Sequence, residues 1–98
     1  MWTKRFKRAR AASGLSQRAL GIAVGLDEFV ASSRINRYEL GVHKPDYTMS
    51  VRLSKVLDIP VAYLYCDQEE MATLILAFHR STQAEKRAAM LALTSAPQ

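Results

Sequence analysis

Apolar residues recur along most of this chain at intervals of three and four, the spacing that places side chains on one face of an α-helix. The first such stripe consists of Trp2, Phe6, Ala9 and Ser13. It predicts a helix over residues 2–13, ended by Gly14 in the position that glycine favours after a helix. The basic residues between these positions, which we expect on the solvated side, are Lys4, Arg5, Lys7 and Arg8. No segment alternates with the two-residue period of a strand, so the chain is predicted to be all-α.

Three further helices are indicated before residue 66. Ser16 is a good N-cap for a second helix that buries Leu20 and Val24 and stops at Gly25. Asp46 is expected to cap another helix through residue 57, with its leucines facing inward. Pro60 then opens a short helical turn with the sequence VAYLY, whose apolar side closes the core.

The segment between Gly25 and Gly41 is less regular. Ala31, Ile35 and Tyr38 share one helical face, but the two apolar residues before them point elsewhere on the same helix. We therefore expect a break near residues 31–32. Residues 27–31 would form a turn or a short helix, and residues 32–40 the helix that follows.

The tail has its own apolar stripe, at positions i, i+3, i+4 and i+7 of a helix. These positions are Met71, Leu74, Ile75 and Phe78. Thr82 and Glu85 have the spacing of a capping box before a last helix over residues 83–93. The tail thus predicts a two-helix unit, which either dimerises through its stripe or packs on its own monomer.

Charge is distributed unevenly along the chain. Residues 1–44 contain nine Lys and Arg against three acids, a net charge of +6, whereas residues 45–98 contain five against six, a net charge of −1. A basic half is typical of proteins with a polyanionic partner, although charge alone does not separate DNA from RNA or an anionic lipid surface.

The single cysteine, Cys66, excludes an internal disulfide framework and a cysteine-rich zinc site. The longest apolar run, residues 71–78, is far shorter than the roughly 20 residues that span a bilayer. The N-terminal charges are not followed by the apolar region of a signal peptide. We expect a cytoplasmic protein, close to the nucleoid in a bacterium, with no membrane partner.

Three motifs follow one another in order between residues 6 and 45. They are F-K-x-x-R-x-x-x-G-L-S-Q at 6–17, A-L-x-x-x-V-G at 19–25 and R-I-N-R-Y-E-x-G-x-x-x-P at 34–45. In this order and spacing the chain resembles the helix-turn-helix regulators of the phage lambda repressor and Cro class, the XRE family. The resemblance implies a compact five-helix DNA-binding domain of the lambda-repressor type over residues 1–66, with a C-terminal two-helix extension over residues 67–98.

The resemblance also implies roles for particular residues. Arg10 and Glu39 match an ion pair that ties the first helix to the end of the recognition helix, the helix that enters the major groove. Candidate base-reading residues are Ser32, Ser33, Arg34, Asn36 and Arg37. Candidate phosphate-binding residues are Ser16, Gln17, Arg18, His43 and Lys44. The chain departs from the family between Gly25 and Glu39, where it is about four residues longer than usual.

The chemistry of these residue types fits the role. Arg donates two hydrogen bonds to guanine O6 and N7, and Asn pairs with adenine N6 and N7. The alternative for Arg34 and Asn36 is contact with phosphates or with solvent alone. For the phosphate candidates, the alternative is an ordinary solvated face.

Catalysis is not expected. The only candidate cluster has no metal-ligand spacing, no Ser/His/Asp arrangement and no phosphate-binding glycine loop; it consists of Cys66, Asp67, Glu69, Glu70 and His79. No cofactor or metal is expected either.

The sequence therefore predicts sequence-specific binding of double-stranded DNA to control transcription, as a repressor that acts as a homodimer on a two-fold operator. The alternative is an antitoxin that binds a toxin protein through its tail and autoregulates its own operon.

Overall fold

The computed structural model describes residues 1–95, and in this part of the chain all regular structure is helical. The elements are α1 (Trp2–Ser13), α2 (Gln17–Ala23), α3 (Ala31–Leu40), α4 (Tyr47–Leu57), α5 (Val61–Tyr65), α6 (Glu69–Arg80) and α7 (Gln83–Thr94). The predicted all-α class is confirmed. The expected break in the third segment is also present, and α3 starts one residue earlier than predicted.

Local hydrogen bonds explain where several helices begin. The hydroxyl of Ser16 accepts the backbone N–H of residue 19 (2.9 Å), and the carboxylate of Asp46 accepts that of residue 49 (2.8 Å). Thr82 and Glu85 form the predicted capping box, in which each side chain accepts the other residue's backbone N–H (3.1 and 2.8 Å). The hydrogen bond from the Thr82 backbone N–H also lowers the pKa of Glu85, because it favours the charged carboxylate. These caps satisfy N–H groups that the helices themselves leave without partners.

The first five helices, α1 through α5, share a single hydrophobic core. Its fully buried large apolar side chains are Phe6, Leu20, Ile35, Leu53 and Leu64, one from each of these five helices. Burying a side chain of this size contributes about 1.5–3 kcal/mol relative to leaving it exposed. The core therefore fixes α2 and α3 relative to α1, α4 and α5.

The prediction that Arg5 lies on the solvated side of α1 was wrong, because its side chain is fully buried. Its Nε donates to the carbonyl oxygen of Cys66 (3.0 Å), its Nη1 donates to Glu69 (3.0 Å), and its guanidinium lies over the ring of Tyr63. The prediction failed because the groups that bury Arg5 come from α5, α6 and their junction, more than 55 residues away. Arg8 remains half-exposed and pairs with the same glutamate (2.8 Å).

The two arginines act on Glu69 electrostatically. Hydrogen bonds from Arg8 and Arg5 to the carboxylate favour its charged form and lower the pKa of Glu69 from 4.5 to about 2. The start of α6 is thus attached to α1. Its other end is held by His79, whose Nε2 lies 3.0 Å from Asp58 Oδ1 at the end of α4.

The apolar stripe of α6 divides between two sides of the helix. Ala72 is buried, and Ile75 and its neighbour Leu76 pack against the core. Met71 and Leu74 are 45% and 49% exposed on the outside. The same helix therefore packs on its own monomer and presents an uncovered apolar face.

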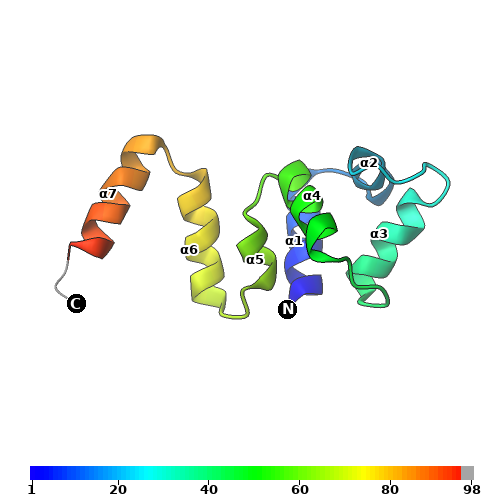
Figure 1. The fold of residues 1–98 in the computed structure, drawn as a ribbon, viewed down its shortest axis with the longest axis horizontal. Helices are drawn as coiled ribbons and strands as arrows, with labels where there is room; N and C mark the ends of the chain where they lie inside the picture. Colours follow the sequence, from blue (N-terminus) through cyan, green and yellow to red (C-terminus); the bar gives the residue numbers. More distant parts are fainter. Residues whose placement is uncertain (96–98) are drawn as a thin grey trace.

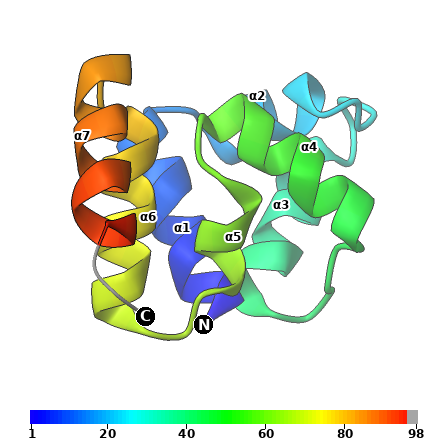
Figure 2. The same cartoon turned by 60° about the vertical axis from the view of Figure 1, so that its left-hand side comes forward.

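The last helix, α7, has no buried residue among those described. Met90, Leu91 and Leu93 are 49%, 69% and 63% exposed. Figures 1 and 2 show α7 beyond α6 at one end of the molecule, whereas α2 and α3 lie at the opposite end. The molecule is elongated as a result, with extents of 53 × 23 × 21 Å.

Candidate nucleic-acid interface

Helices α2 and α3 are in very close contact at Gly21. A Cβ atom at this position would lie 2.6 Å from the Cβ of Ala31 and 2.9 Å from its backbone oxygen. Only glycine leaves room for this approach, and Ala31 is itself fully buried. The contact sets the start of α3 against the middle of α2, and the sequence analysis did not single it out.

The two faces of α3 differ sharply. Ala31, Ile35 and Tyr38 point inward and are at most 5% exposed. The five predicted base-reading residues lie on the remaining surface of the helix. Ser32, Ser33, Asn36 and Arg37 are exposed, and Arg34 is half-buried. The structure therefore brings these side chains together on one helix, at the end of the molecule opposite the tail (Figure 1).

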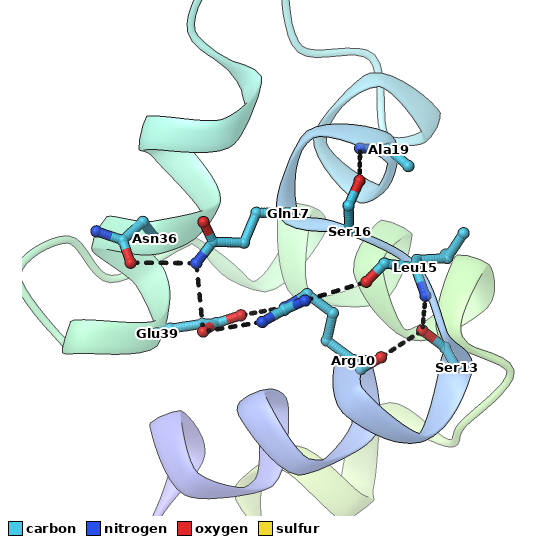
Figure 3. A network of polar contacts seen from close by, with 8 residues as sticks. All are labelled: Arg10, Ser13, Leu15, Ser16, Gln17, Ala19, Asn36 and Glu39. Atoms are coloured by element: carbon cyan, nitrogen blue, oxygen red, sulfur yellow. Dashed lines mark hydrogen bonds and ion pairs between the residues drawn. The ribbon is translucent and has the colours of Figure 1, made fainter.

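An ion pair supports this helix from behind. Arg10 Nε donates to Glu39 Oε1, Nη2 lies 3.5 Å from Oε2, and Nη1 donates to the carbonyl oxygen of Leu15 (3.0 Å). The side chains of Arg10 and Glu39 are 21% and 5% exposed, so the carboxylate is almost completely removed from water. Figure 3 shows this pair joining α1 to α3 and to the segment before α2.

Gln17 extends the ion pair to the exposed face of α3. Its Nε2 lies 3.5 Å from Glu39 Oε2 and 3.1 Å from Asn36 Oδ1. A carboxylate only accepts hydrogen bonds, so Glu39 fixes the nitrogen of Gln17 on this side, and the nitrogen in turn faces the oxygen of Asn36. The amide nitrogen of Asn36 then points away from the network (Figure 3). Asn36 is thereby presented outward chiefly as a hydrogen-bond donor.

The predicted phosphate-binding residues lie in two places. Ser16, Gln17 and Arg18 form the beginning of α2, while His43 and Lys44 are exposed in the loop after α3. The hydroxyl of Ser16 is occupied as the cap, and the side-chain N–H groups of Gln17 face Asn36 and Glu39. The side chains of Ser16 and Gln17 therefore already have hydrogen-bond partners within the protein.

Arg18 has a partner that sequence reasoning missed. Its Nη2 lies 3.3 Å from Glu28 Oε2, and both side chains remain more than half exposed. This pair links α2 to the turn before α3. At the tip of that turn is Phe29, an 88% exposed side chain to which the sequence analysis assigned no role.

In the part of the chain that the structure describes, no helix is long and apolar enough to cross a membrane. No group of three or more His, Cys, Asp or Glu side chains within residues 1–95 is arranged to hold a metal ion.

A family model described as helix-turn-helix (HTH_3) matches residues 6–64, more than half of the chain. The chain therefore belongs to this helix-turn-helix family, the XRE class of DNA-binding transcriptional regulators. Among solved structures, it is similar to the crystal structure of the transcriptional regulator BswR, with 42% sequence identity and a TM-score of 0.92. That similarity covers 98% of this chain and 95% of the BswR chain, so it includes the tail helices. Comparison with curated proteins gave no match.

Proposed function

We propose that this protein represses transcription by binding, as a homodimer, to a two-fold operator in double-stranded DNA. The observation that carries the proposal is the exposed surface of α3. This surface carries two hydroxyls, two guanidinium groups and an oriented amide, which belong to Ser32, Ser33, Arg34, Arg37 and Asn36. The start of α2 lies beside it. A helix of this kind lies in the major groove while the preceding helix and loops contact phosphates.

Within this surface, Arg34 and Arg37 have the chemistry to recognise guanine. Because the Asn36 oxygen already accepts a bond from Gln17, its outward nitrogen favours base acceptors such as guanine N7 and O6 or thymine O4. The same nitrogen can donate to adenine N7, but bidentate pairing with adenine would also require the remaining lone pair of the Asn36 oxygen to accept from N6. His43 and Lys44 would add phosphate contacts beyond the C-terminal end of α3.

Selection of bound duplexes from a random library tests sequence specificity directly. The wild type is expected to enrich a two-fold symmetric consensus. Its affinity for non-specific duplex should fall with salt, with a log–log slope of about −0.9 for each phosphate contacted. A wild type that enriches no sequence, or an affinity that does not change between low and physiological salt, would refute the proposal.

We assign dimerisation to the tail. An isolated helix of twelve residues is marginal in water, and α7 has no buried residue within the monomer, so we expect it to require a further packing partner. Its exposed apolar residues, Met90 and Leu91, share a groove with Phe78 at the end of α6. Met71 and Leu74 form a second uncovered apolar surface on α6. In a two-fold dimer, the tail of the second copy would cover both the groove beside Phe78 and the surface formed by Met71 and Leu74.

The split of the α6 stripe provides matched variants for this assignment. Leu74→Asp is expected to give a folded monomer, because Leu74 is half-exposed on the outer side. Ile75→Asp introduces a charge beside the core and is expected to destabilise the fold itself. Light scattering and circular dichroism measure the two effects. A monomeric wild type at micromolar concentration would refute the dimer and leave a different protein, such as a toxin, as the partner of this surface.

A further inference from the structure

The turn between α2 and α3 holds the most exposed large apolar side chain in the described part of the protein. Phe29 is 88% exposed, and its neighbour Val30 is 41% exposed. The turn is nevertheless well defined. The Asp27 carboxylate accepts the backbone N–H of Phe29 (2.9 Å), and the Asp27 carbonyl accepts that of Val30 (3.0 Å). Phe29 is therefore presented on a hydrogen-bonded turn.

The base of this turn is also anchored. The backbone N–H of Leu26 donates to the carbonyl oxygen of Gly21 (2.9 Å), and its side chain packs against the core. Two residues after Phe29, Ala31 is fully buried against Gly21. The position of Phe29 relative to α3 is thus fixed from both sides.

Its location places Phe29 next to the proposed DNA surface. A recognition helix inserts its N-terminal residues into the major groove, and Phe29 lies on the turn directly before that N-terminus. Ser32 and Ser33, on the first turn of α3, are exposed three and four residues after Phe29. With α3 in the major groove, a side chain at this position would be close to the bases that the first turn of α3 contacts.

The charges of the turn allow this approach. Glu28 would repel phosphates, but it is paired with Arg18 (3.3 Å). The carboxylate of Asp27 accepts a backbone hydrogen bond within the turn. The side chain at the tip is a phenyl ring, which neither donates nor accepts an ordinary hydrogen bond. The apolar feature of a base pair in the major groove is the C5-methyl group of thymine.

We propose that Phe29 is a specificity-determining residue that makes an apolar contact with a thymine methyl group, beside the bases contacted by the first turn of α3. This inference rests on the proposed function, because it places α3 in the major groove. It adds recognition of one further base pair in each half-site.

The test uses the full chain and the duplex that the wild type selects from a random library. The selection is repeated with Phe29→Ala and with Ile22→Ala, a control that shortens an exposed aliphatic side chain on α2. Phe29→Ala is expected to lose a thymine preference at one position in each half-site and to keep the rest of the consensus. The control is expected to keep the whole consensus.

Deoxyuridine provides a second measurement, because it lacks only the methyl group of thymine. Replacing that thymine should weaken wild-type binding about fourfold for each methyl group buried. The same replacement should leave the affinity of Phe29→Ala unchanged. An unchanged consensus for Phe29→Ala, or an equal effect of deoxyuridine on both proteins, would overturn the role of Phe29 and leave the proposed function intact. A wild type that selects no sequence would instead overturn the proposed function.

Discussion

Removing Arg10 should destabilise this protein far more than removing a surface arginine. The variant Arg10→Met keeps much of the side-chain volume but leaves the Glu39 carboxylate, 5% exposed, without its cation. The other nearby donor is Gln17 Nε2, at 3.5 Å. Breaking a buried ion pair from one side costs about 3–5 kcal/mol. Because Arg10 is itself 21% exposed, we expect the lower end of this range.

Urea unfolding followed by circular dichroism measures this loss. With a slope of about 1.5 kcal/mol per molar urea, a loss of about 3 kcal/mol lowers the midpoint by about 2 M. The matched control is Arg18→Met. Its ion pair with Glu28 is more than half exposed on both sides and should contribute less than about 1 kcal/mol.

The double variant Arg10→Met/Glu39→Met separates the ion pair from simple loss of packing. It removes both charges, so it should be more stable than Arg10→Met alone. The reasoning would be refuted if Arg10→Met lowered stability by less than about 1 kcal/mol, or if the double variant were the less stable of the two.

Three further outcomes are expected. Gly21→Ala should lower stability by about 1–3 kcal/mol in the same urea experiment, and adding Ala31→Gly should restore only part of it, because backbone atoms of residue 31 also lie within 2.9 Å. In the folded protein the pKa of Glu69 is about 2, below its ordinary 4.5. The stability that its charged carboxylate contributes is therefore present above pH 4.5 and is lost as the pH falls towards 2. Glu69→Gln should flatten this part of a profile of unfolding free energy against pH. Gln17→Ala should relax base preference where Asn36 contacts DNA, which repeated selection would detect, whereas a uniform loss across sequences would indicate a phosphate contact alone.

The helices could be predicted because their limits depend on nearby residues. Ser16, Asp46 and Thr82 accept hydrogen bonds from N–H groups three residues ahead, and Gly14 has the left-handed conformation (φ 76°) expected after a helix. Such signals are complete within a few positions of the sequence. They required no knowledge of how the helices pack.

The placement of α6 could not be predicted in the same way. Its stripe indicated an apolar face but not which residues meet the core. Cys66 and Glu69 are among the residues that bury Arg5, and these two contacts join positions more than 60 residues apart. The hydrogen bond between Gln17 and Asn36 likewise depends on how α2 crosses α3, which Gly21 determines through a contact with Ala31.

The length of the molecule has a consequence for the arrangement of an operator. Helix α3 and helix α7 lie at opposite ends of a protein 53 Å long (Figure 1). Two copies joined at their tails would therefore hold their recognition helices well apart. Half-sites face the same side of DNA only at whole turns, about 34 Å each. A spacing of two turns, about 20 base pairs between half-site centres, suits such a dimer better than one turn. Since Arg5 and Glu69 attach the tail to α1, the protein itself would set this distance.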